Sequence, residues 1–78
     1  MPCRVGITTD LTTRRAYWQA HVIGFANWRI LEKSRSKEKA QEYETWYAGR
    51  YGCRAHAGGP DTPGTWYVYR FDYTRERV

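Results

Sequence analysis

Hydrophobic and polar residues alternate along three segments of the chain, residues 3–9, residues 27–32 and residues 66–73. A period of two is typical of strands that bury one face, so each segment predicts a strand. The last segment has the strongest pattern, because every second residue from Tyr67 to Tyr73 is aromatic. Rings at these positions favour a strand over a helix.

Helical signals lie between these strands. Asp10 is a candidate N-cap for a helix over residues 11–21. Ser36 is the corresponding candidate for residues 37–51, where apolar side chains recur every three or four residues, and Gly52 follows the last of them. The order strand, helix, strand, helix, strand predicts an α+β domain with helices packed on a small sheet.

The rest of the chain is expected to be irregular. Residues 54–64 are rich in glycine and proline and predict a loop, in which the glycines at 58–59 offer backbone N–H groups to an anion. The 78 residues have room for one core, which we place in residues 1–73, and the charged residues 74–78 are expected to form a frayed tail. The aromatic side of residues 66–73 has two interpretations: the core under the helices, which we favour, or a platform on which bases stack.

Charge and composition narrow the function. The chain carries 13 basic and 8 acidic residues, a net charge of +5, and ten of the basic residues are arginine. Arginine forms paired hydrogen bonds with phosphate oxygens and stacks on rings. Together with 17% aromatic residues, this is typical of surfaces that bind nucleotides or nucleic acids, although ordinary solvated charge would give the same count.

The same composition excludes two classes of protein. Its many aromatic residues exclude a disordered chain, and no apolar stretch has the length of a membrane span or the form of a secretory leader. We therefore expect a cytoplasmic protein without membrane partners, located in the host cytoplasm if a phage encodes it.

The two cysteines, Cys3 and Cys53, are too few for the disulfide framework of a small secreted domain, so we expect both to be reduced. A bridge between them requires that they lie on neighbouring elements. Cys53 and His56 have the spacing of half a zinc site, but no second pair of ligands has such a spacing. We therefore expect no structural zinc.

The most specific local motif is Gly6-Ile-Thr-Thr-Asp-Leu-x-x-Arg14-Arg15. A strand ends there in small polar residues, a helix begins, and two guanidinium groups follow within its first turns. Loop N–H groups, a helix N-terminus and an arginine near one point suit an anion. The alternative is an ordinary capped helix with solvated arginines.

This motif resembles the second half-motif of the GIY-YIG nuclease superfamily, in which a strand ending in Tyr-x-Gly leads into a helix bearing the catalytic arginine. Arg14 has the family's spacing, eight residues after Gly6. A later helix of the family carries a metal-binding glutamate, whose counterpart here is Glu44 or, less well matched, Glu42. The resemblance covers residues 4–51 and implies a three-stranded antiparallel sheet packed with two helices.

The sequence departs from the family pattern at several positions. Arg4 replaces the tyrosine before x-Gly, Trp18 stands where the family has a basic residue or histidine, and no asparagine follows Glu44. The family's first strand, with its Gly-x-Tyr motif, has no counterpart at the start of the chain.

A segment near the C-terminus resembles this missing first strand. The run from Gly64 to Phe71 places a glycine before Tyr67 and Tyr69 in a strand pattern. In the family, the first strand pairs antiparallel with the Tyr-x-Gly strand. A permuted order therefore predicts that residues 66–73 lie antiparallel beside residues 3–8.

Metal-assisted hydrolysis requires a divalent ion held by carboxylates, an activated water and a cation that stabilises the developing charge. The resemblance implies that Arg14, Glu44 and Tyr67 or Tyr69 would be the catalytic residues of a nuclease, with Glu44 holding Mg²⁺. Because Arg4 replaces the tyrosine that helps to activate water, we expect instead a binding site without turnover or cofactor. Its predicted contacts are Arg4, Gly6, Arg14 and Arg15 at the phosphate, and His56, Trp66 and Tyr67 at the base or sugar.

The expected function is thus non-catalytic binding of a phosphate-bearing ligand, a nucleotide signal or a nucleic acid. Stand-alone domains of this size resemble small proteins of phages and mobile elements, where such a binder would sequester a nucleotide or antagonise host defence. Two other functions stay open: an active divalent-metal endonuclease built on Arg14 and Glu44, and a protein–protein adaptor with an aromatic surface. A homo-oligomer is a further expectation, because a domain this small can need a second copy to complete its site.

Overall fold

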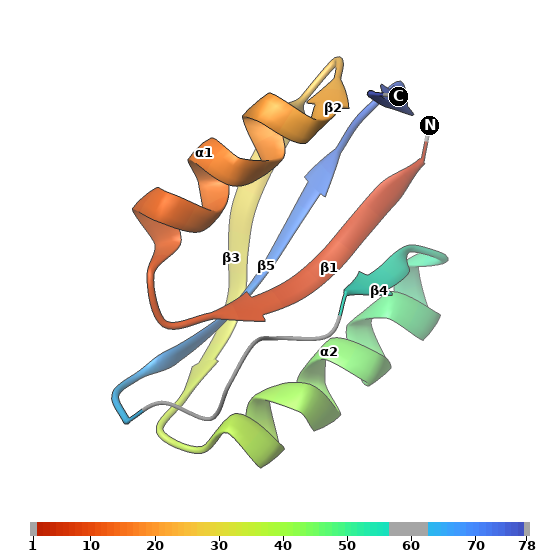
Figure 1. Cartoon of the computed structure of the whole chain (residues 1–78). Coiled ribbons are helices and arrows are strands. Elements are labelled where there is room, and N and C mark those ends of the chain that lie inside the picture. Colours follow the sequence, from red (N-terminus) through yellow and green to blue (C-terminus); the bar gives the residue numbers. More distant parts are fainter. Residues whose placement is uncertain (1, 57–62, 78) are drawn as a thin grey trace.

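Helices α1 and α2 lie on either side of a four-stranded sheet, in a computed structural model that describes residues 2–56 and 63–77 (Figure 1). A second sheet of two short strands joins the end of α1 to the C-terminal segment. The elements in chain order are β1 (Cys3–Thr8), α1 (Leu11–His21), β2 (Val22–Ile23), β3 (Ala26–Ser34), α2 (Lys37–Tyr51), β4 (Arg54–His56), β5 (Trp66–Asp72) and β6 (Arg75–Glu76). The α+β class is therefore confirmed. Neither described helix is long and apolar enough to cross a membrane.

The strand order of the large sheet is β3-β5-β1-β4. β5 runs antiparallel to both β3 and β1, with Gly6 of β1 opposite Tyr69 of β5. The prediction that residues 66–73 lie antiparallel beside residues 3–8 is confirmed. β4 completes the sheet by pairing parallel to β1 through three residue pairs.

The expectation of a three-stranded antiparallel sheet is wrong, because the large sheet is mixed and has four strands. The additional strand, β4, falls inside residues 54–64, where we predicted a loop. A three-residue strand has no hydrophobic period of its own, and its extended conformation depends on pairing with β1. The glycines at 58–59, with the rest of residues 57–62, lie outside the described residues.

The two faces of the sheet carry separate cores. Alternate residues of β1 and β5 point to opposite faces, as in any strand. On the α2 face the buried residues are Val5, Ile7, Ala40, Ala48, Trp66 and Val68. On the α1 face they are Trp18, Val22, Tyr69, Phe71 and Tyr73, with Phe25 and Trp28 packed against them. Three of the four rings on the aromatic side of β5 and its end, Tyr69, Phe71 and Tyr73, therefore lie in a core, the interpretation that we favoured, while Tyr67 is half-buried.

Both helices begin where their N-caps predict, and α2 also ends where Gly52 predicts. The Asp10 carboxylate accepts a hydrogen bond from the Thr13 N–H at 3.0 Å, and the Ser36 hydroxyl accepts one from the Lys39 N–H at 3.3 Å. Gly52 closes α2 in the left-handed conformation, with φ of 68°. Such a φ favours glycine, because other residues pay a steric cost there.

The C-terminal segment is paired, where we expected a frayed tail. β6 runs antiparallel to β2, with Val22 opposite Glu76 and Ile23 opposite Arg75. The Thr74 and Arg77 N–H groups donate to the carbonyl oxygens of Ile23 and His21, at 2.8 and 2.9 Å. This pairing follows from tertiary contact with the chain after α1, because the charged residues of β6 have no strand pattern of their own.

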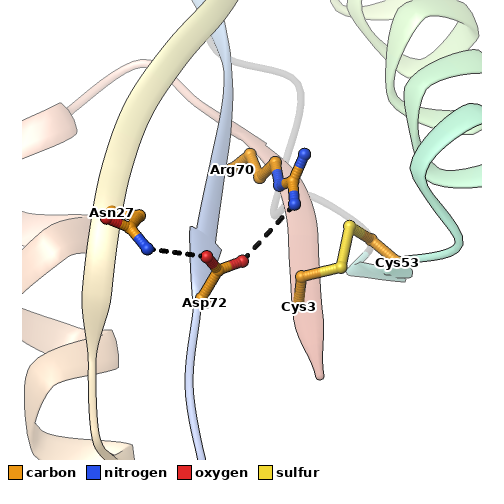
Figure 2. Close-up of a disulfide and its surroundings, with 5 residues drawn as sticks. All are labelled: Cys3, Asn27, Cys53, Arg70 and Asp72. Carbon is orange, nitrogen blue, oxygen red and sulfur yellow. Dashed lines mark hydrogen bonds and ion pairs between the residues drawn. A yellow bond between two sulfur atoms is a disulfide. The ribbon is translucent and has the colours of Figure 1, made fainter. Parts of the chain in front are cut away.

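A disulfide joins Cys3 to Cys53, so the expectation that both cysteines are reduced is wrong (Figure 2). The cause is the parallel pairing of β1 with β4, which opposes Arg4 to Arg54 and brings the preceding residues together. Their Cα atoms are 4.8 Å apart, within the range that a disulfide spans.

A polar network lies close to the disulfide on the neighbouring strands. Asp72, the register partner of Cys3, accepts hydrogen bonds from Asn27 Nδ2 at 2.9 Å and from Arg70 Nη2 at 3.5 Å (Figure 2). The Asn27 contact ties β3 to β5.

Candidate functional site

Arg4 lies on β1, on the sheet face that α1 covers. Its register partner on β5 is Phe71, which belongs to the α1-side core, and register partners share a face. Its side chain lines a cleft of about 250 Å³ between β1, the second half of α1 and the C-terminal segment. The residues that line this cleft are Arg4, Tyr17, Trp18, His21, Glu76 and Arg77. We call it the Arg4 cleft.

The Arg4 guanidinium is held by rings and by one acid. It lies over the rings of Trp18 and Tyr73, at 5.0 and 5.9 Å from their centroids, and its Nη2 forms an ion pair with the Glu76 carboxylate. Only 12% of the Arg4 side chain is exposed. Its Nε–H is fully buried and reaches no acceptor among the described residues. The permanently charged Arg4 guanidinium thus has one buried hydrogen-bond donor beside the cleft for which the described residues provide no acceptor.

Gly6 and Tyr69 lie next to the Arg4–Phe71 pair, on the same face of the sheet. The Tyr69 hydroxyl lies against Gly6, in the space that a side chain at this position would fill, and accepts a hydrogen bond from Trp18 Nε1 at 2.9 Å. Burial raises the pKa of the Tyr69 phenol above its ordinary value of 10.0, and the Glu44 charge adds to this effect, whereas the Trp18 hydrogen bond and the charges of Arg14 and Arg4 oppose it. The phenol is therefore neutral at neutral pH.

Arg14 lies on the same face of the molecule, in the first half of α1. Its guanidinium stacks over the Tyr17 ring at 5.1 Å, and the His21 ring stacks on Tyr17 at 3.9 Å. Tyr17 and His21 are exposed, so this row of side chains leads along α1 to the Arg4 cleft. Arg15, one residue further along α1, is exposed to solvent.

We expected an anion at the N-terminus of α1. The carboxylate of Asp10, the N-cap of this helix, occupies that position. Asp10 Oδ1 accepts from the Thr13 N–H at 3.0 Å, and Asp10 Oδ2 accepts from the Thr13 hydroxyl at 2.8 Å. These hydrogen bonds lower the pKa of Asp10 below its ordinary value of 3.8. The Asp10 carboxylate therefore caps the N-terminus of α1, and the Arg4 cleft lies toward the other end of the helix.

Glu44 is buried on the inner side of α2, in line with Ala40 and Ala48, with 5% of its surface exposed. α2 covers the opposite face of the sheet from α1, so Glu44 and Arg14 belong to helices on different sides (Figure 1). Within residues 2–56 and 63–77, no three His, Cys, Asp or Glu side chains gather as a metal site would require.

The remaining predicted contacts are dispersed. We expected the Trp66 ring at a ligand, but Trp66 is 3% exposed and belongs to the α2-side core. Tyr67 is half-buried beside a separate cleft of about 380 Å³, whose other lining residues are Lys33, Ser34, Arg35 and Thr65. His56 is the register partner of Gly6 on β4, and its side chain lies outside the described part of the structure.

The structure thus keeps Arg4, Gly6 and Arg14 on one face and adds five cleft residues that sequence reasoning missed. These are Tyr17, Trp18, His21, Glu76 and Arg77. Tyr17 and His21 carried a detectable signal, because their four-residue spacing places both on one side of α1 beside Arg14. Glu76 and Arg77 carried none, because only the pairing of β2 with β6 brings them to Arg4.

Comparisons with protein-family models, with curated proteins and with solved structures find no match to this chain. The resemblance to the GIY-YIG superfamily therefore stays a prediction, and the function is argued from the site itself.

Proposed function

We propose that this protein binds a phosphate-bearing ligand in the Arg4 cleft and does not cleave it. The observation that carries the proposal is the buried guanidinium of Arg4, whose Nε–H has no acceptor among the described residues. Arginine stays charged at all accessible pH, and an unmet buried donor costs free energy. A phosphate oxygen would satisfy this donor, since guanidinium groups bind phosphates through paired hydrogen bonds.

The charges around the cleft support an anionic ligand. Arg77 and His21 line it, and Arg54 is the register partner of Arg4 on the neighbouring strand, so it shares the same face of the sheet. The chain as a whole carries a net charge of +5. Such a potential draws anions toward the cleft and raises their rate of association.

The rings beside the cleft favour a nucleotide over a bare phosphate. Tyr17 is 38% exposed and stacks with His21, one of the residues that line the cleft. Aromatic rings beside a guanidinium are the combination with which proteins hold bases and phosphates together. The ligand class that we propose is therefore a nucleotide or the exposed end of a nucleic acid.

The proposed absence of cleavage rests on the burial of Glu44. Metal-assisted cleavage needs a carboxylate-held ion and a cation on the same scissile phosphate. Here Glu44 is only 5% exposed, on the inner side of α2. Because Mg²⁺ keeps several of its waters in protein sites, a carboxylate this buried favours binding without turnover over a nuclease.

A protein–protein adaptor is the second candidate, and one observation favours it. Trp46 on α2 is 59% exposed and lies in a groove of about 390 Å³ with Tyr43 and Tyr47. Salt distinguishes the two candidates: binding through phosphates weakens steeply as salt rises, whereas an apolar protein contact does not.

The proposal is tested by thermal shift at low salt with mononucleotides, linear and cyclic dinucleotides, single- and double-stranded DNA and RNA, each with and without Mg²⁺. A ligand at about 100 times its dissociation constant adds about 2.7 kcal/mol of stability, several degrees for a domain this small. We expect a metal-independent shift with at least one of these ligands.

Matched variants locate the binding. Arg4→Gln and Arg77→Gln should reduce the shift, whereas Arg29→Gln, which removes the same charge from exposed β3, should retain it. Circular dichroism of each variant checks that it folds. Equal shifts in the Arg4, Arg77 and Arg29 variants would contradict the proposal.

A further inference from the structure

Glu76 occupies the charged edge of the Arg4 cleft. Its carboxylate forms the ion pair with Arg4 Nη2, and 47% of its side chain is exposed, against 12% for Arg4. The acid therefore approaches the buried guanidinium from the solvent side. It is also the one acidic residue among those that line the cleft in the described chain.

The contact with Glu76 leaves Arg4 incompletely satisfied. A guanidinium presents its N–H groups in a planar fork that accepts two oxygens of one anion side by side. Here the Glu76 carboxylate meets one terminal nitrogen, while the Nε–H has no exposed surface and no acceptor among the described residues. The position of Glu76 is fixed by its place opposite Val22 in the small sheet, not by Arg4 alone.

The element that carries Glu76 is weakly held. β6 has two residues, both exposed, and pairs only with the two residues of β2. Two further backbone hydrogen bonds flank this pair, from the Thr74 N–H to Ile23 of β2 and from the Arg77 N–H to His21 at the end of α1. Short edge strands with exposed hydrogen bonds open at low free-energy cost.

We propose that Glu76 is an internal competitor for the ligand: the incoming phosphate displaces its carboxylate from Arg4 and releases β6 from β2. This inference rests on the proposed function. It also specifies the ligand, because a phosphate monoester carries a charge of about −1.5 to −2 at neutral pH and a carboxylate only one unit. A monoester should therefore displace Glu76 better than a singly charged diester does.

The test compares Glu76→Gln with Glu38→Gln in the full chain. Both variants raise the net charge equally, but Glu38 lies in the exposed first turn of α2, away from the Arg4 cleft. The probes are adenosine 5′-monophosphate and its methyl ester, which has the same base and sugar but is a diester. Affinities are measured by titration calorimetry at low salt.

Glu76→Gln should bind the monophosphate about fivefold more tightly than Glu38→Gln does. This is the effect expected from the loss of one partly exposed ion pair. In Glu38→Gln and in the natural chain, the monoester should bind more tightly than the diester. Saturation with the monophosphate should also speed amide exchange at Thr74 and Arg77 of the natural chain, but not at Cys53, whose N–H bonds to Ala48 at the end of α2.

The outcomes separate the two proposals. If both variants bind the monophosphate equally and the Thr74 and Arg77 amides keep their exchange rates, the displacement of Glu76 is wrong and the Arg4 cleft still binds. If neither variant nor the natural chain binds either probe, the proposed function fails for nucleoside phosphates, and the competitor role of Glu76 fails with it.

Discussion

The hydroxyl of Tyr69 occupies the space that a side chain on Gly6 would need. The two residues face each other across β1 and β5, and Tyr69 is fully buried and bonded to Trp18 Nε1 at 2.9 Å. Position 6, next to the Arg4 cleft, therefore requires glycine, because the Tyr69 ring lies so close to the backbone of β1 there. In the resemblance to Tyr-x-Gly, this glycine belongs to a nuclease motif. In the structure, the absence of a side chain on Gly6 leaves space for the buried Tyr69 phenol.

Gly6→Ala should therefore destabilise the protein. Its new methyl group meets a ring that the core holds in place, and overpacking of this kind costs about 1–3 kcal/mol. The measurement is urea-induced unfolding followed by tryptophan fluorescence.

Gly49→Ala is the matched control for this substitution. Among the described residues nothing lies within 4 Å of a methyl group there, and Gly49 is helical, in the last turn of α2, so alanine should stabilise the protein by about 0.5–1 kcal/mol. Equal unfolding midpoints for the two variants would show that Tyr69 does not require glycine at position 6.

The disulfide should supply much of the stability. It joins residues 50 apart, and closing a loop of this length in the unfolded chain is worth about 4 kcal/mol on the chain-entropy estimate. A domain of this size has a stability on the order of 5–10 kcal/mol in total. Reduction, or the double variant Cys3→Ser and Cys53→Ser, should therefore lower the unfolding midpoint strongly.

The same experiment tests whether the bridge forms in the purified protein. Reagents that label free thiols should not react with the unfolded chain before reduction and should label two cysteines after it. Identical midpoints with and without a dithiol reductant would contradict a stabilising bridge.

Asp10 should make stability depend on pH in the acid range. Hydrogen bonds from Thr13 lower the pKa of Asp10 below 3.8 in the folded chain. The carboxylate therefore stabilises the folded chain at pH values above the pKa that Asp10 has in the unfolded chain. This stabilisation is lost as the pH falls through the lower pKa of Asp10 in the folded chain. The difference in unfolding midpoint between the natural chain and Asp10→Asn, which keeps a capping side chain, should shrink between about pH 7 and about pH 3. A constant difference would mean that the Asp10 charge contributes nothing.

Glu44 should not be required for ligand binding, and no cleavage should depend on it. Glu44 is 5% exposed, on the inner side of α2. Labelled DNA and RNA incubated with the protein and Mg²⁺ or Mn²⁺ should stay intact on a denaturing gel, and Glu44→Gln should bind nucleotides as the natural chain does. Cleavage that disappears in Glu44→Gln and in Arg14→Gln, but not in Arg29→Gln, would instead establish the nuclease.

The long elements of the fold could be predicted because each carries its own periodic signal. β5 alternates aromatic and other residues over its length, and both of its faces are covered, one by α1 and one by α2. The caps Asp10 and Ser36 mark the helices by local hydrogen bonds alone. The short strands β2, β4 and β6 have too few residues for any period, and they form because a partner strand lies beside them.

The candidate site was predictable in part. Arg4 was expected at the phosphate from its place in the motif, and the structure gives it a cleft. Trp66 and Tyr67 were expected at one ligand, yet neighbours in a strand point to opposite faces, so the alternation itself already argued against that pairing. Glu76 and Arg77 reach Arg4 only through tertiary pairing of a charged segment with the end of α1, which no local pattern encodes.

The central claim is that the Arg4 guanidinium receives the phosphate of the ligand. The most direct test is a nuclear magnetic resonance titration of the chain with ¹⁵N-labelled arginine, following the Nε–H signal of each of the ten arginines as nucleotides are added. Phosphate binding at Arg4 predicts a saturable shift of the Arg4 signal with at least one nucleotide, and little change at Arg29, which is exposed on β3. An Arg4 signal that stays fixed while nucleotides bind, or that moves no more than the signal of Arg29, would contradict it.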